Sequence, residues 1–105
     1  MPVVNTLECD FGWKARDFNL ISTDEEYYSL QSIKGDKGTV VVFICNHCPY
    51  VIAIAQRLSY EAKELKKIKV NTIAIMSNDV ETYPEDSFDN MKKFSQKYNF
   101  DFPYI

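Results

Sequence analysis

One short run constrains the fold of this chain more than any other. An apolar, β-branched stretch at residues 39–44 is followed at once by Cys45-Asn46-His47-Cys48-Pro49. The stretch predicts a strand buried on both faces. Proline suits the first helical position, where its missing N–H costs nothing. An apolar stripe at helical spacing then follows, made of Val51, Ile54, Ala55, Leu58, Ala62 and Leu65. The run therefore predicts a strand that leads through two cysteines into a helix.

The rest of the sequence predicts the elements around this junction. Residues 17–22 alternate as a half-buried strand does, with residues 27–28 as a hairpin partner and a short helical turn at 29–34. A second buried strand is expected at 70–76, and Asp86 or Ser87 can cap a final helix. The apolar stripe of that helix is Phe88, Met91, Phe94 and Tyr98. The order predicts one α/β domain over residues 1–105, with parallel strands and right-handed crossovers.

Composition excludes several functional classes. The 105 residues carry a net charge of −3, so no basic field indicates nucleic-acid binding. No apolar run approaches the roughly 20 residues that a membrane span needs, and no signal peptide is recognisable. A cytoplasmic location is the default expectation. Three cysteines are too few for a disulfide framework and suit a redox role better.

The two cysteines of the junction are the candidate catalytic residues. Functional groups of parallel sheets gather at the carboxyl ends of the strands, and the two cysteines follow the carboxyl end of the strand at 39–44. Cys48 is expected to be the exposed nucleophile, because the positive end of the helix stabilises a thiolate. Cys45 lies closer to the buried strand and is a resolving thiol or a bystander. His47 either stabilises a thiolate or faces solvent in a turn, and Asn46 is a turn residue.

A metal site is not expected. Cys45, His47, Cys48 and Cys9 could supply ligands, but zinc sites usually need a second ligand pair with defined spacing. Cys9 has no partner in its polar segment and is expected to be passive. An acidic cluster around Pro84 indicates helix N-terminal charge rather than a metal site, and its members are Glu81, Glu85, Asp86 and Asp89. No metal and no other cofactor is predicted.

These residues resemble the peroxiredoxin-like (AhpC/TSA, redoxin) branch of the thioredoxin-like superfamily. Asp17-Phe18-Asn19-Leu20 is similar to the opening strand of that branch, and Ser29-Leu30, Gly35 and residues 40–43 follow in the expected order. The string FICNHCPYV closely resembles a subgroup that carries an NHCP motif. The resemblance covers nearly the whole chain from about residue 15. It implies a thioredoxin-like fold and a thiol-dependent oxidoreductase.

The same alignment places Cys48 at the nucleophilic position of thioredoxin-like reductases. Val51 then replaces their second cysteine and also occupies the peroxidatic position of peroxiredoxins, so thiol–disulfide exchange is expected over peroxide reduction. The partners would be a disulfide or peroxide substrate and an external thiol reductant. Two alternatives remain open, which are a non-catalytic binding module and an inactive truncated relative.

The resemblance also implies segments that the sequence lacks, since relatives continue with a cis-proline loop, two more strands and a helix. We therefore expect a shortened chain that comprises the hairpin and the βαβα part of the fold. The strand that ends at Ile44 would then have an open edge, through which the chain should self-associate.

Overall fold

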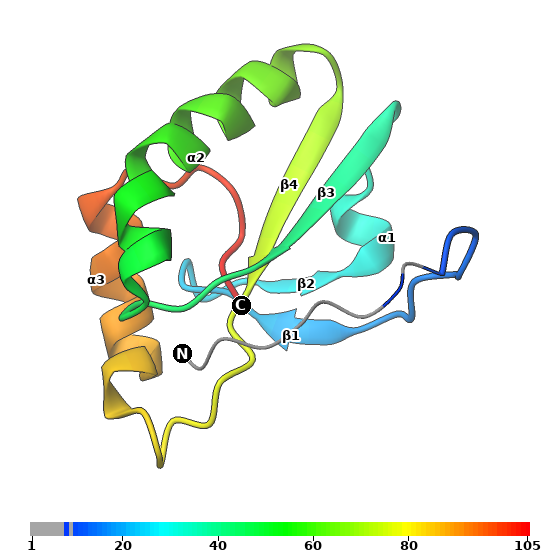
Figure 1. Cartoon of the computed structure of the whole chain (residues 1–105). Coiled ribbons are helices and arrows are strands. Elements are labelled where there is room, and N and C mark those ends of the chain that lie inside the picture. Colours follow the sequence, from blue (N-terminus) through cyan, green and yellow to red (C-terminus); the bar gives the residue numbers. More distant parts are fainter. Residues whose placement is uncertain (1–7, 9) are drawn as a thin grey trace.

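A computed structural model describes residue 8 and residues 10–105 of the chain, so Cys9 lies outside the described residues. It confirms the α/β thioredoxin-like order (Figure 1). Over the described residues, no helix combines the length and apolar character of a membrane span. The elements are β1 (Asn19–Ile21), β2 (Tyr27–Ser29), α1 (Leu30–Ile33), β3 (Gly38–Phe43), α2 (Pro49–Lys67), β4 (Val70–Ile75), the 3₁₀ turn η1 (Pro84–Asp86) and α3 (Phe88–Lys97).

The sheet that positions the cysteines consists of β3 and β4. They pair in parallel from Gly38 opposite Val70 to Phe43 opposite Ile75. Near the end of the chain, Tyr104 forms a parallel bridge with Ala74 on the other edge of β4. In the described residues no strand pairs with the outer edge of β3. The loops after β3 and β4 leave the sheet at the same end, as parallel pairing requires.

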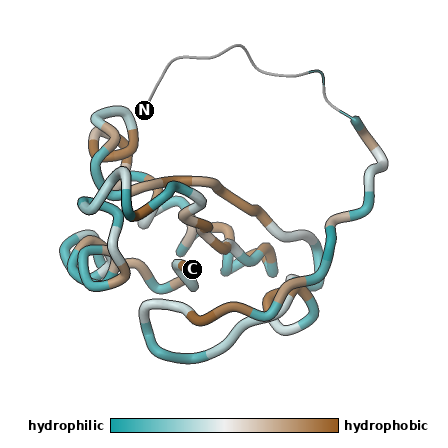
Figure 2. Tube along the Cα trace, turned by 90° about the horizontal axis from the view of Figure 1, so that it is seen from below, coloured by the Kyte–Doolittle hydropathy of each residue, from teal (hydrophilic) through white to brown (hydrophobic). Residues whose placement is uncertain are grey.

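Helices cover the two faces of this sheet unequally. α2 and α3 lie on one side and α1 lies on the other (Figure 1). The larger core, between the sheet and the two long helices, contains the two thiols and the buried residues Val51, Ala55, Ala74, Met91, Phe94 and Tyr104. The smaller core, next to α1, is built on Ile33, Ile73 and Ile105. Hydrophobic stretches accordingly run through the middle of the molecule in Figure 2.

Two burial predictions were wrong. β3 is not buried on both faces, because Val41 is 40% exposed and Phe43 is 66% exposed. They lie on the same face as their β4 partners Ile73 and Ile75, which the smaller core next to α1 includes, but that core does not extend to them. In α2, Ile54 is 50% exposed, whereas Ser59 is buried at 3%. The hydroxyl of Ser59 donates a 3.0 Å hydrogen bond to the carbonyl of Asn99, which satisfies a polar group inside the core.

Candidate functional site

Cys48 lies where the sequence places it, as the N-cap residue of α2 with Pro49 in the first turn. The backbone N–H of Val51 lowers the pKa of the Cys48 thiol, and it outweighs burial, which raises that pKa; the N–H of Tyr50 adds to the lowering. The side chain makes no regular capping hydrogen bond, so the effect is that of nearby oriented dipoles. A lowered pKa increases the thiolate fraction, and the thiolate is the nucleophilic form.

Cys45 is perturbed in the opposite direction. Burial raises the pKa of its thiol, and the negative charge of Asp86 raises it further. The backbone N–H groups of Cys48 and His47 act against these effects without overcoming them. Both thiols are free, and they are close enough to affect each other's pKa. The pair is therefore asymmetric, with an activated thiol at the helix and a protonated one behind it.

The expectation that Cys48 is exposed was wrong. Cys48 is only 3% exposed and Cys45 is 1% exposed. Both belong to the larger core, where they pack with Val51 and Ala55. The neighbouring Tyr50, by contrast, is 78% exposed. A position at the start of a helix fixes the electrostatics of a thiol, but the packing around it decides how far solvent reaches it.

The residue that sequence reasoning missed is Asp86, which is fully buried next to the thiols. Its Oδ1 accepts a 2.7 Å hydrogen bond from the backbone N–H of Asn46, and its Oδ2 accepts one of 3.0 Å from Asn78. Oδ2 also lies 2.7 Å from Nδ1 of His47. Burial alone would raise the pKa of Asp86, but contacts with His47, Asn78 and the Asn46 N–H outweigh it and lower the pKa. A buried carboxylate thus stays ionised beside Cys45.

His47 and Asn46 prove to be structural parts of the site. The His47 side chain is 19% exposed and stacks on Tyr83 with ring centroids 5.1 Å apart, so a solvent-facing turn residue is excluded. The Asn46 side chain donates to the carbonyl of Glu85 at 3.1 Å and accepts from the Tyr104 hydroxyl at 2.7 Å. Burial raises the pKa of Tyr104, which keeps that hydroxyl a donor. Asn46 is therefore more than a turn residue, since it joins the cysteine loop to η1 and to the end of the chain.

The interpretation of the acidic cluster needs correction for one of its members. Ser87 is the N-cap of α3, and its hydroxyl accepts from the N–H of Asn90 at 3.2 Å. Asp89 lies in the first turn of that helix, as expected for helix N-terminal charge. Asp86 instead points into the site. The one sequence signal for it was its position in the connection after β4, at the same end of the sheet as Cys45.

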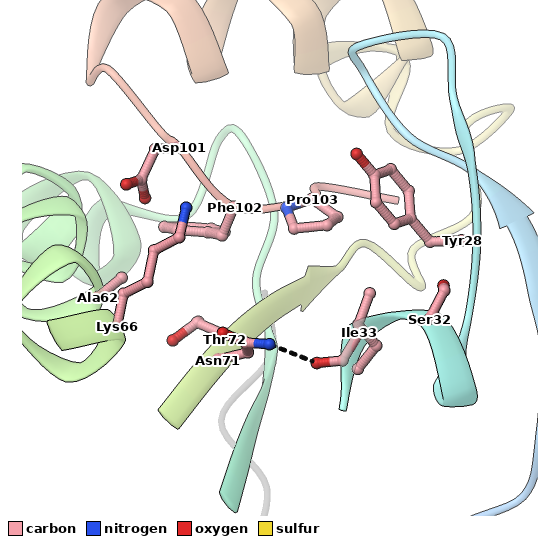
Figure 3. Close-up of a pocket in the computed structure, with 10 residues that line it drawn as sticks. All are labelled: Tyr28, Ser32, Ile33, Ala62, Lys66, Asn71, Thr72, Asp101, Phe102 and Pro103. Atoms are coloured by element: carbon pink, nitrogen blue, oxygen red, sulfur yellow. Dashed lines mark hydrogen bonds between the residues drawn. The ribbon is translucent and has the colours of Figure 1, made fainter. Parts of the chain in front are cut away.

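A separate cavity of about 210 Å³ lies away from the thiols (Figure 3). Its floor is Asn71 and Thr72, near the opposite end of β4 from the cysteines. Lys66 and Asp101 lie on one side of it, and Tyr28 lies on the other. No cysteine lines it. Among the described residues, the thiols therefore lie in the loop 44–48 and not at this cavity.

The sequence profile of the AhpC/TSA family matches residues 11–105. The chain belongs to the AhpC/TSA family. Among curated protein sequences, none matches it. The family assignment agrees with the hairpin and the parallel strands described above.

Solved structures show the same fold. An uncharacterized conserved protein from Geobacillus kaustophilus is 40% identical, with a TM-score of 0.94, over 100% of this chain and 56% of that one. A hypothetical protein from Sinorhizobium meliloti 1021 is 28% identical, with a TM-score of 0.88, over 93% and 54%. A secreted disulfide oxidoreductase from Mycobacterium tuberculosis, homologous to E. coli DsbE, shares 21% identity and a TM-score of 0.66, over 84% and 58%. The chain thus spans little more than half the length of these proteins.

Proposed function

We propose that this AhpC/TSA family member carries out thiol–disulfide exchange, with Cys48 as nucleophile and Cys45 as resolving thiol. The observation that carries the proposal is the asymmetry of the pair, because the pKa of Cys48 is lowered and that of Cys45 is raised. An attacking thiol benefits from a high thiolate fraction near neutral pH. The raised pKa of Cys45 keeps that thiol mostly protonated, so Cys48 is the one that attacks the substrate first.

The reaction follows from this arrangement. The Cys48 thiolate attacks one sulfur of a substrate disulfide, which forms a mixed disulfide and releases the other sulfur as a thiolate. Cys45 then loses its proton and attacks Cys48, which closes the Cys45–Cys48 disulfide and releases the second substrate thiolate. The substrate gains two electrons, and an external thiol reductant restores the dithiol.

His47 and Asp86 are the proposed proton acceptors for Cys45. A side-chain oxygen of Asp86, a ring nitrogen of His47 and the Cys45 sulfur all lie within 4.8 Å of one another. The pKa of Asp86 is lowered, so its carboxylate is ionised, and its Oδ2 lies 2.7 Å from Nδ1 of His47. The proton lost by Cys45 therefore has an acceptor at short range inside the core.

Peroxide reduction is the second candidate, and it uses the same two thiols. A peroxide would oxidise Cys48 to a sulfenic acid, and Cys45 would condense with it to form the disulfide and water. We favour a disulfide as substrate because Val51, at the peroxidatic position of the family, is a buried apolar residue in α2.

The test compares single-cysteine variants with a small disulfide and with hydrogen peroxide, using a thiol reductant in both assays. Cys48→Ser should abolish disulfide reduction, whereas Cys45→Ser should accumulate a mixed disulfide on Cys48 that mass spectrometry detects. Cys9→Ser is the control and should keep the wild-type rate. Full turnover by Cys48→Ser would refute the proposal, and turnover of peroxide alone would favour the second candidate.

A further inference from the structure

Three side chains of different chemistry meet inside the core next to the cysteine loop. Ligand-type atoms of Cys45, His47 and Asp86 lie within 4.8 Å of one another. Cys45 and Asp86 are buried, and His47 is partly buried. The loop after β3 supplies Cys45 and His47, and η1 supplies Asp86 from about 40 positions further along the chain. The fold thus provides the second ligand segment that the sequence alone did not show.

The bonding of His47 indicates that this cluster can take a ligand. Both ring nitrogens are buried, and neither makes a hydrogen bond of regular geometry. Nδ1 approaches Oδ2 of Asp86 to 2.7 Å without such a bond. Buried imidazole nitrogens without partners are costly unless another group binds them. A cation between the imidazole, the carboxylate and the thiol would satisfy all three.

We propose that the reduced protein binds Zn²⁺ through Cys45, His47 and Asp86. Thiolate, imidazole and carboxylate are the three side-chain ligands that zinc takes in proteins. The thiolate disfavours Mg²⁺ and Ca²⁺, which prefer oxygen, and the carboxylate disfavours Cu⁺, which prefers sulfur. Three protein ligands leave one tetrahedral position open, as in exchangeable or catalytic zinc sites.

The geometry needs only a small adjustment. Zinc bonds of about 2.0–2.3 Å place tetrahedral ligand atoms roughly 3.5 Å apart. The three atoms therefore have to close from at most 4.8 Å, while the His47–Asp86 contact opens from 2.7 Å. Asn46 and Asn78 already hold the carboxylate in place, in the way that outer partners orient metal ligands. On binding, Zn²⁺ takes the place of the proton that Cys45 loses.

The test is a titration of the reduced protein with Zn²⁺ in competition with a chromophoric chelator, together with a titration with Co²⁺. Wild type should bind one ion per chain, and the Co²⁺ form should show thiolate-to-metal charge transfer. Cys45→Ser should lose that band. Asp86→Asn and His47→Gln should each weaken Zn²⁺ binding by roughly 10- to 100-fold or more. Glu85→Gln changes the adjacent exposed carboxylate and should bind like wild type.

The proposal is overturned if Co²⁺ gives no thiolate band with wild type. It is also overturned if both Asp86→Asn and His47→Gln bind Zn²⁺ as tightly as wild type does. Using two variants covers the case in which one of them fails to fold, which circular dichroism reveals. The titration does not depend on turnover. A failure to bind metal would therefore not contradict the exchange reaction, and a failure of exchange would not contradict the metal site.

Discussion

The substitution Asp86→Ala should destabilise the protein far more than its place in an acidic, polar segment suggests. The Asp86 side chain is fully buried, and its removal leaves two hydrogen-bond donors without an acceptor. These are the Asn46 N–H at 2.7 Å and the Asn78 amide at 3.0 Å. The His47 ring also loses the carboxylate oxygen that lies 2.7 Å from its Nδ1. An unsatisfied buried donor costs about 1–3 kcal/mol. Relief from burying the charge offsets part of the sum over the two donors, so we expect a net loss of about 2–4 kcal/mol.

The assay is urea denaturation of reduced protein at pH 7, with linear extrapolation to water. Glu85→Ala is the matched control, because Glu85 is the exposed neighbour of Asp86 in the same turn. It should change the free energy of unfolding by no more than about 0.5 kcal/mol, as most surface substitutions do. If Asp86→Ala loses less than about 1 kcal/mol, or no more than the control, the reasoning about this carboxylate is wrong.

The pH dependence of stability provides an independent check on the same carboxylate. The pKa of Asp86 is lower in the folded protein than its ordinary value, because contacts with His47, Asn78 and Asn46 outweigh burial. Its stabilising effect is therefore present above the unfolded value of about 3.9 and is lost as the pH falls through the lower folded pKa. The difference in unfolding free energy between wild type and Asp86→Asn should narrow below about pH 4. A difference that stays constant down to pH 2 would contradict the shift.

Three further predictions concern other parts of the chain. Site-resolved iodoacetamide alkylation of the reduced protein should show Cys48 reacting with a midpoint below the ordinary thiol value of about 8.5 and Cys45 with one above it; equal midpoints would refute the asymmetry. Gly35→Ala should lower the melting temperature, because the added Cβ would overlap the backbone carbonyl oxygen of Gly38; an unchanged melting temperature would show that the backbone there yields freely. Phe43→Lys, which puts a charge on an exposed position of β3, should reduce self-association in sedimentation velocity; a wild type that is monomeric throughout would contradict association through that edge.

Much of the fold was predictable because its signals are local. A β-branched run, a proline at the first helical position and an apolar stripe identified β3 and α2 without tertiary information. The same holds for the stripe of α3, where Met91 and Phe94 are buried as expected. The solvent exposure of individual side chains was less predictable. Phe43 belongs to a continuous apolar run, yet it is 66% exposed. The smaller core on its face of the sheet includes its β4 partner Ile75 but does not extend to Phe43.

In the candidate site, too, the effects with local causes were predictable and those with distant causes were not. The lowered pKa of Cys48 comes from backbone N–H groups two and three residues away, so the sequence could predict its direction. The raised pKa of Cys45 comes from burial and from Asp86, which lies 41 positions along the chain, and no local pattern contains either cause. Spacing alone therefore made Cys45 ambiguous between a resolving thiol and a bystander.

The pKa shifts of Cys48 and Cys45 should respond differently to partial unfolding. Partial unfolding that frees η1 from the cysteine loop would remove Asp86 from Cys45 but leave the start of α2, and hence the activation of Cys48, in place. The pKa of Cys45 should then move toward its ordinary value, while that of Cys48 stays low. Alkylation in the low-urea range before global unfolding can therefore separate the two contributions. A simultaneous change at both thiols would show instead that the helix start and the buried carboxylate form one cooperative unit.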